Sequence, residues 1–321
     1  MTSWPFGDMT LRGVVPPIVT PLLNHDEIDR EGTRRLLEHI LQAEIAGVFA
    51  LGTTGEFSSL SLSVRSEFVR LCCQIVNGRV PVLVGIADTA FTTTIELAKV
   101  AKEAGASAVV LTTPYYFPME QTEVIDYVKH VLDQIDMPIM LYNIPAMTKV
   151  WLEKDTLRAL AKHTQIVGIK DSSGDMNYFA EILKLKELRP DWSIFVGPEH
   201  LLAQAVALGA DGGVNGGANV YPKLFVATCR AALNGDQTQC ETLMKRVDAF
   251  NAIYRVGAPG FRFVSATKCA LACKNICSEY PAPPLTSLSP TEKDHVRMIL
   301  SDVDAANNRV HQGPMRLSDR H

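Results

Sequence analysis

The stretch VPVLVGIADTAFTTTIELAKVAKEAGASAVVLTT, residues 80–113, decides the fold of this chain. It begins with the apolar run VPVLVG (80–85), continues with a segment of helical periodicity (92–105), and ends with the apolar run SAVVLTT (107–113). The middle segment starts with threonines, which often cap helices, and ends with Gly105, a common helix terminator. Continuously apolar runs are typical of strands buried on both faces, as in a parallel sheet. The stretch therefore predicts a strand, a helix and a second strand.

The same alternation recurs along most of the chain. In the segment 30–47, Leu36, Leu37 and Ile40 fall on one helical stripe, and Gly47 is expected to end the helix. Eight such units in roughly 220 residues favour a (β/α)8 TIM barrel. A doubly wound open sheet would usually have fewer units and a glycine-rich motif after its first strand, which this chain lacks. The predicted strands are 13–20, 47–52, 80–85, 107–113, 137–143, 164–170, 192–197 and 210–216.

The strand pattern stops near residue 222. The segments 221–235, 237–255 and 261–275 have helical patterns, and a last helix is expected near 290–306. We therefore expect a (β/α)8 barrel domain over 11–235 and a small C-terminal helical region over 236–306. The polar residues 307–321 are expected to form a flexible tail.

Composition excludes several classes of protein. The chain has 321 residues, of which 47% are hydrophobic and 21% charged, as in ordinary globular proteins. A net charge of −4 and a pI near 6.1 give no electrostatic reason to expect nucleic acid or an anionic membrane as a partner. No apolar run has the 18 or so residues that a spanning helix needs, and the first residues do not resemble a secretory signal. We expect a cytoplasmic location.

Seven cysteines raise the question of a metal site. Cys269, Cys273 and Cys277 recur every four residues, so they are expected to share one helical face. No histidine or CxxC spacing accompanies them, and the chain has no HExxH motif. We therefore expect these cysteines to pack in the core, with no metal bound.

The active site of a TIM barrel lies at the carboxyl ends of its strands. In this chain these ends carry one lysine, three tyrosines and several hydroxyl groups but few metal ligands, which argues against metal-dependent chemistry. The segments concerned are Thr20, GTTGE (52–56), TPYYFP (113–118), YNIP (142–145), Lys170, GPEH (197–200) and VNGGAN (214–219).

Lys170 is the residue in this set with the most distinctive chemistry. A lone lysine at a strand end is ordinarily a solvated charge, but inside a barrel mouth desolvation favours the neutral amine, which adds to ketones to form a Schiff base. That chemistry needs a proton shuttle, for which Tyr142, Tyr116 and Thr53 have suitable hydroxyls. Taken singly, each motif has a simpler interpretation: the tyrosines can cap the barrel, GTTGE can be a turn, and YNIP can end a strand. Only their conjunction is specific.

In this order and spacing, GTTGE, TPYY, YNIP and GIKD resemble the dihydrodipicolinate synthase and N-acetylneuraminate lyase family of class I pyruvate-dependent aldolases. The resemblance extends from about residue 11 to about residue 285. It implies a (β/α)8 barrel with a C-terminal helical region, a covalent Schiff base with pyruvate, no separate cofactor, and a homotetramer or homodimer.

The resemblance also implies roles for single residues. Lys170 matches the lysine that condenses with pyruvate, and Tyr142 matches the tyrosine that moves protons at the reacting oxygen. Thr53 and Thr54 match the pair that binds the pyruvate carboxylate. Tyr116 matches a tyrosine that in many members reaches across a dimer interface into the neighbouring site. The backbone at Val214 matches a segment that lines the pyruvate end of the site.

One departure concerns dihydrodipicolinate synthases. They usually carry an arginine five residues after the YNIP tyrosine, to hold the carboxylate of aspartate semialdehyde, and this chain has Met147 there. A thioether cannot make a bidentate contact with a carboxylate. Lys149 lies nearby in the sequence and is a partial substitute.

Other departures concern sialic acid lyases, which usually have a threonine two residues after the lysine and an Asp-Glu pair after strand 7. This chain has Ser172, and Glu199 and His200 within GPEH. Gly216 also lacks the hydroxyl found at its position. With Gly197, Ser172 and Glu199 nearby, we expect a polar acceptor pocket of modest size.

The sequence therefore predicts a lyase that reversibly cleaves a 2-oxo-4-hydroxy acid, of the 2-keto-3-deoxy sugar type, to pyruvate and an aldehyde. The enzymatic alternatives are dihydrodipicolinate synthase itself and a sugar-acid dehydratase on the same Schiff-base scaffold. A keto-acid-binding sensor that has lost turnover is the alternative from outside enzymology, although the intact lysine, tyrosines and threonines argue against it.

Overall fold

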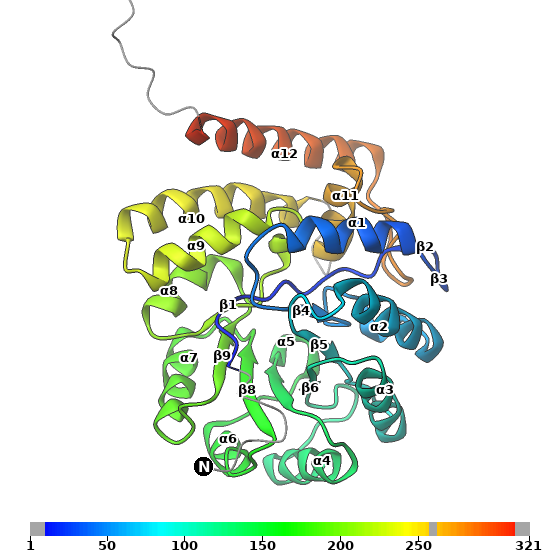
Figure 1. The fold of residues 1–321 in the computed structure, drawn as a ribbon, viewed down its shortest axis with the longest axis vertical. Helices are drawn as coiled ribbons and strands as arrows, with labels where there is room; N and C mark the ends of the chain where they lie inside the picture. Colours follow the sequence, from blue (N-terminus) through cyan, green and yellow to red (C-terminus); the bar gives the residue numbers. More distant parts are fainter. Residues whose placement is uncertain (1–9, 257–261, 312–321) are drawn as a thin grey trace, which may run out of the picture.

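A computed structural model describes residues 10–256 and 262–311, with side chains described to residue 306. Its main sheet has eight parallel strands in the order β1-β10-β9-β8-β7-β6-β5-β4. The two edges meet where Pro17, just beyond β1, bridges to Phe49 of β4: the amide of Ile18 donates to the Phe49 carbonyl at 2.9 Å. The sheet thus closes into a TIM barrel surrounded by helices (Figure 1), and the predicted fold class is confirmed.

Every predicted strand has its counterpart, and most are shorter than predicted: β1 ends at Val14 instead of 20, whereas β8 runs one residue past its predicted end, to Asp171. The strands of the barrel are β1 (Gly13–Val14), β4 (Val48–Ala50), β5 (Val82–Gly85), β6 (Ala108–Thr112), β7 (Ile139–Asn143), β8 (Ile166–Asp171), β9 (Ser193–Val196) and β10 (Gly212–Gly213). A short antiparallel hairpin, β2 (Leu22–Asn24) with β3 (Glu27–Ile28), was not anticipated; its runs are too short to show periodicity.

Helices alternate with these strands, and several begin at residues whose side chains accept backbone N–H groups, such as Asp29 before α1 and Asp175 before α7. The helices of the barrel are α1 (Arg30–Leu41), α2 (Leu62–Val76), α3 (Phe91–Glu103), α4 (Gln121–Gln134), α5 (Pro145–Thr148), α6 (Lys154–Leu160), α7 (Met176–Leu183), α8 (Leu202–Ala207) and α9 (Pro222–Leu233). Short 3-10 turns are η1 (Phe57–Ser59), η2 (Lys184–Glu187), η3 (Glu199–Leu201), η4 (Gly216–Asn219) and η5 (Ala252–Arg255).

Two predicted helix boundaries were wrong. Helix α1 ends at Leu41 rather than at Gly47, because the amide of Ala46 is needed to donate to the Val14 carbonyl beside β1 at 2.8 Å. Helix α3 has Ala90 as its N-cap, and the threonines lie inside its first turn. The loop before α3 is instead held by Asp88, whose carboxylate accepts from the amide of Ala90 at 2.9 Å.

Beyond α9 the chain forms α10 (Gln237–Asn251), η5, α11 (Phe263–Cys273) and α12 (Pro290–His311), and Figure 1 shows α12 at the end of the molecule farthest from α4 and α6. The predicted C-terminal helices are therefore present. Helix α12 extends five residues past the expected limit at 306, and the rest of the predicted tail, 312–321, lies outside the described residues.

Cys269 and Cys277 are buried and Cys273 is half-buried, so core packing is as expected. The shared helical face was wrong for Cys277, because α11 ends at Cys273 and the backbone turns at Asn275, whose φ is 57°. Within residues 10–256 and 262–311, no group of three or more histidine, cysteine or acidic side chains is arranged to hold a metal ion. Over the same residues, no helix combines the length and the apolarity needed to cross a bilayer.

Two apolar clusters separate the inside of the barrel from its shell. The larger one packs the helices against the outer face of the strands. The smaller one fills the barrel and includes Phe49, Leu83, Val110, Met140 and Phe195, with Tyr142 as its polar member. A packed interior confines any binding site to the two mouths of the barrel.

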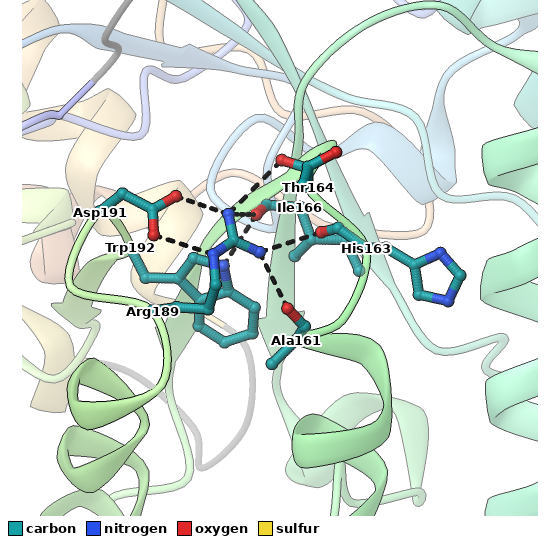
Figure 2. Close-up of polar contacts among 7 residues, drawn as sticks. All are labelled: Ala161, His163, Thr164, Ile166, Arg189, Asp191 and Trp192. Carbon is teal, nitrogen blue, oxygen red and sulfur yellow. Dashed lines mark hydrogen bonds and ion pairs between the residues drawn. The ribbon is translucent and has the colours of Figure 1, made fainter. Parts of the chain in front are cut away.

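Arg189 secures the amino-terminal end of β8, the strand that carries Lys170 at its other end. Its guanidinium donates to the carbonyls of Ala161, His163 and Ile166, each at 3.0 Å, and pairs with Asp191 (Figure 2). The Trp192 indole N–H donates to the same Ile166 carbonyl at 2.8 Å. One side chain therefore satisfies acceptors of the connection between α6 and β8 and of the first residue of β8, at the amino-terminal mouth of the barrel.

We predict that Arg189→Met destabilises the fold. Loss of charge-assisted bonds to several carbonyls is expected to cost about 2–4 kcal/mol. Denaturant unfolding measures this change, and Arg158→Met, which removes only an exposed i,i+3 pair with Asp155, is the matched control with a change below about 0.5 kcal/mol. Equal stability of the two variants would contradict the prediction.

Candidate active site

A cavity of about 920 Å3 opens at the carboxyl ends of the barrel strands. Every predicted site residue except Tyr116 lines it: Thr53, Thr54, Tyr142, Met147, Lys170, Ser172, Gly197, Glu199 and Val214. These residues come from β7, β8 and the loops after β4, β7, β8, β9 and β10. The structure therefore brings together groups that lie up to about 160 positions apart in the chain, as parallel strands of a closed barrel do.

Lys170 lies at the floor of this cavity and is only 5% exposed. Its Nζ is 4.0 Å from the centre of the Tyr142 ring and 5.3 Å from that of Phe49. Within the described residues no carboxylate pairs with it, so its polar surroundings are aromatic faces and hydroxyls. A buried lysine without a counter-ion is a suitable nucleophile for a carbonyl carbon.

The register of two neighbouring strands places the tyrosine beside the lysine. Tyr142 of β7 is the pairing partner of Lys170 of β8, so both side chains point into the barrel. The register shifts just below this pair, since Ile139 pairs with Ile166 but Met140 pairs with Gly168. At Gly168 a side chain would lie 2.0 Å from the carbonyl oxygen of Ser193, so only glycine allows β9 to approach at this irregularity.

The hydroxyl of Tyr142 is within reach of two others. Its oxygen is 3.4 Å from Thr53 Oγ1 and 3.5 Å from Ser172 Oγ. Burial by itself raises the pKa of Tyr142, but the positive charge of Lys170 and the hydroxyl contacts outweigh it, so the pKa of this phenol is lowered. A phenol of lowered pKa is suited to take up and return a proton.

The GTTGE segment forms a tight loop at the carboxyl end of β4. The amide of Gly55 donates to the Gly52 carbonyl at 2.9 Å, and that of Glu56 donates to the Thr53 carbonyl at 3.1 Å. These consecutive turns leave Thr53 and Thr54 facing the cavity. Two hydroxyls beside Lys170 can bind the carboxylate of a keto acid.

Glu199 is the acidic group on the far side of the cavity. One oxygen, Oε1, accepts from the amide of Gly217 at 2.5 Å and from the hydroxyl of Tyr254 at 3.1 Å. The other, Oε2, is buried and has no hydrogen-bond partner among residues 10–256 and 262–306. Burial raises the pKa of Glu199 to about 7, against the opposing effect of these two hydrogen bonds.

The sequence analysis missed the residues that the C-terminal region contributes to this far side. Tyr254 of η5 holds Glu199, and Asn251 at the end of α10 has a buried Oδ1 with no hydrogen-bond partner within the described residues. The charged Asp248 and Arg255 line the cavity as well. They belong to the C-terminal helical region, which has no strand ends. Nothing in the local sequence marks them, because their placement depends on how α10 packs against the barrel.

Small residues keep the far side open. A side chain at Gly197 would meet Ser172 Oγ at 2.0 Å, so glycine there allows Ser172 to face Tyr142. A Cβ at Gly216 would lie 3.5 to 3.8 Å from Glu199, Tyr254 and Thr54, a position inside the cavity. Both glycines therefore determine how much room an acceptor has.

Two residues lie away from the site in this chain. Tyr116 is 77% exposed and packs edge-to-face on Phe117, with 5.1 Å between the ring centres. Lys149 is exposed, and its Nζ donates to the Ala146 carbonyl at 2.9 Å rather than lining the cavity. It does not replace the arginine whose place Met147 takes, since Met147 lines the cavity and Lys149 does not.

Comparison with known proteins gives a consistent picture. The sequence profile of the dihydrodipicolinate synthetase family matches residues 10–303. A probable 2-dehydro-3-deoxy-D-pentonate aldolase of Escherichia coli, YjhH, is 32% identical over 292 residues, which are 90% of this chain and 96% of that protein.

Solved structures agree with the fold. The dihydrodipicolinate synthase of Bacteroides thetaiotaomicron has a TM-score of 0.89 and 42% identity, over 91% of this chain and 98% of that one. YagE of Escherichia coli, a protein of the dihydrodipicolinic acid synthase family solved in complex with pyruvate, has a TM-score of 0.86 and 29% identity, over 91% of this chain and 98% of its own.

We predict that Glu199→Gln stabilises the protein in a pH-dependent way. Because the folded-state pKa of Glu199 is raised, the folded protein binds an extra proton between about pH 4.5 and 7, and its stability falls as pH rises through that window. The free-energy advantage of the glutamine variant over wild type should grow by about 2 kcal/mol between pH 5.5 and 8.5.

Denaturant unfolding at the two pH values tests this expectation. The exposed Glu96 provides the control. The free energy of unfolding of Glu96→Gln should differ from that of wild type by the same amount at pH 5.5 and at pH 8.5. A glutamine variant at 199 that behaves like the control would show that Glu199 is not held in a desolvated site.

Proposed function

This chain belongs to the dihydrodipicolinate synthetase family, and we propose that it cleaves a 2-oxo-4-hydroxy acid of the 2-keto-3-deoxy sugar type, reversibly, to pyruvate and a hydroxylated aldehyde. It is a pyruvate-dependent lyase. The observation that carries the choice of substrate is the acceptor end of the cavity, where Glu199 has a buried oxygen with no hydrogen-bond partner in the part of the chain that the structure describes. The aldehyde itself and the residue roles below are part of the proposal.

The first step forms a covalent bond to Lys170. Lys170 passes a proton to Tyr142, its amine adds to C2 of the keto acid, and Tyr142 returns the proton as water leaves, so that a protonated imine remains and no separate cofactor is needed. The hydroxyls of Thr53 and Thr54 hold the carboxylate beside the imine, and the backbone at Val214 lines the same end. The positive imine then serves as the electron sink for the next step.

Carbon–carbon cleavage follows at the C3–C4 bond. Tyr142, as the phenolate, takes the proton of the C4 hydroxyl; the C4 oxygen becomes the aldehyde carbonyl, and the bonding electrons move into an enamine. Tyr142 then returns the proton to C3, and water releases pyruvate from Lys170. Its lowered pKa and its contacts with Thr53 and Ser172 suit this exchange.

The far end of the cavity suits hydroxyl groups on the aldehyde, and Arg255 is the cation that lines the cavity beside them. Glu199 Oε2 and Asn251 Oδ1 are buried acceptors with no partner among the described residues, and substrate hydroxyls can satisfy them as donors. An ionised Glu199 repels a carboxylate, and Met147 offers none of the donors that a carboxylate needs. Gly197 and Gly216 leave the space for the hydroxylated chain.

Dihydrodipicolinate synthase is the second candidate function. The 42% identity to the synthase of Bacteroides thetaiotaomicron favours it, and both reactions begin with the same imine at Lys170. The synthase reaction instead joins pyruvate to aspartate semialdehyde, whose carboxylate would have to be held near Met147. The two functions therefore differ only at the acceptor end.

We also propose that the chain forms a homodimer, or a homotetramer built from two such dimers, and the position of Tyr116 supports this. Tyr116 and Phe117 form an exposed aromatic pair, 77% and 73% accessible, next to the strand end of β6. Large exposed aromatics of this kind are typical of protein interfaces. We propose that Tyr116 enters the site of the partner subunit and connects with its proton relay.

Borohydride reduction in the presence of pyruvate tests the enzyme. We expect a pyruvyl adduct on Lys170 and none in Lys170→Ala or Lys170→Arg. Steady-state kinetics of condensation should then favour glyceraldehyde over aspartate semialdehyde by at least about tenfold in kcat/KM, because one charge-assisted contact is worth roughly that factor or more. An adduct together with a preference for aspartate semialdehyde would establish the synthase instead.

Subunit mixing tests the role of Tyr116. Lys170→Ala and Tyr116→Phe proteins should each be impaired, the second by roughly tenfold or more. After subunits exchange at random, about half of the dimers contain one subunit of each variant. One of the two sites in such a dimer has both an intact Lys170 and an intact Tyr116 from the partner, so about a quarter of all sites should regain activity. If labelled subunits exchange but activity stays absent, Tyr116 does not act across the interface.

A further inference from the structure

A buried ion pair lies directly beneath the GTTGE loop. Glu56, the last residue of that loop, is in contact with Nζ of Lys268 from α11, and neither side chain has any exposed surface. The two residues are 212 positions apart in the chain. A fully desolvated pair of this kind is costly to form, which makes its position beside an active-site loop informative.

The pair ties the loop to several parts of the C-terminal region. Glu56 Oε1 accepts from the amide of Ala282 at 2.7 Å, and Lys268 Nζ donates to the Tyr280 carbonyl at 2.8 Å. Both charges are therefore hydrogen-bonded as well as paired. Burial raises the pKa of Glu56 and lowers that of Lys268, while each charge opposes the shift of the other.

On the loop side, Glu56 is connected to the threonines that line the cavity. Its backbone is in the left-handed region, with φ of 58°, and its amide donates to the Thr53 carbonyl at 3.1 Å. The preceding Gly55 carbonyl accepts from the Thr20 hydroxyl at 2.7 Å. Left-handed backbone at a non-glycine residue persists only where its surroundings hold it. Here the buried contacts of the glutamate side chain provide that constraint.

We propose that Lys268 and Glu56 are positioning residues for the bound keto acid: the buried ion pair lets the C-terminal helical region hold the loop so that Thr53 and Thr54 face the substrate carboxylate. This inference rests on the proposed function, because it assigns the carboxylate to that loop. Neither Lys268 nor Glu56 lines the cavity, so both act through the threonines.

Lys268→Met tests the inference, because it removes the charge while keeping most of the side-chain volume. The readout is the pyruvate concentration that gives half-maximal borohydride-trapped adduct on Lys170. We expect this concentration to rise about tenfold or more, as for the loss of a charged hydrogen bond to the substrate, while saturating pyruvate still labels Lys170 fully. The melting temperature should fall as well, because Glu56 is left buried without a partner.

The double variant Glu56→Gln/Lys268→Met separates positioning from stability. It leaves no unpaired charge, and the glutamine can still accept from Ala282, so its melting temperature should recover towards that of wild type while half-saturation by pyruvate stays raised. This variant also carries the test if Lys268→Met does not fold. Recovery of both quantities together would mean that the pair serves only stability and would overturn the inference.

A matched control comes from the same region. Lys274→Met removes a contact of 2.9 Å with Asp304 between the end of α11 and α12, away from the loop. It should lower the melting temperature and leave half-saturation by pyruvate unchanged. An unaltered half-saturation in Lys268→Met, or an equal rise in the control, would also overturn the inference. No adduct in the wild-type protein would instead reject the proposed function, and with it this inference.

Discussion

The pairing of β7 with β8 is the constraint on which the site depends. It sets Tyr142 opposite Lys170 on the inner face of a closed barrel, with the amine 4.0 Å from the centre of the phenol ring. The positive charge of the lysine lowers the pKa of the phenol that shares its buried position. A shift of this register by one residue would turn one of the two side chains out of the barrel. The irregularity at Gly168 is therefore part of what places these two side chains together.

The two ends of the cavity are built by different parts of the chain. Strand ends and their loops supply Lys170, Tyr142 and the threonines, which suit a keto acid. The acceptor end depends on Glu199 together with Tyr254 and Asn251 from the C-terminal region. A family that shares the first end can change its second substrate through the other, which agrees with relatives named both as sugar-acid aldolases and as synthases.

Buried charge recurs around the site, and in each case hydrogen bonds offset the cost of desolvation. Glu56 and Lys268 neutralise each other and are further satisfied by backbone groups. Burial raises the pKa of Glu199 to about 7, and one of its oxygens has no hydrogen-bond partner within the described residues. We propose that the paired group holds a loop and that the unpaired one is available to a ligand. The C-terminal helices take part in both, so they belong to the function of the barrel.

The sequence by itself determined the barrel, because eight apolar runs of strand length leave few other ways to be buried, and it indicated the residues at the strand ends, because parallel strands end at one mouth. It also pointed to Lys170, through motifs whose order is specific. It did not reveal the end of α1, the β2–β3 hairpin, the irregularity at Gly168, or the approach of Tyr254, Asn251 and Lys268 to the site. Those features depend on contacts between residues far apart in the chain, so only tertiary packing decided them.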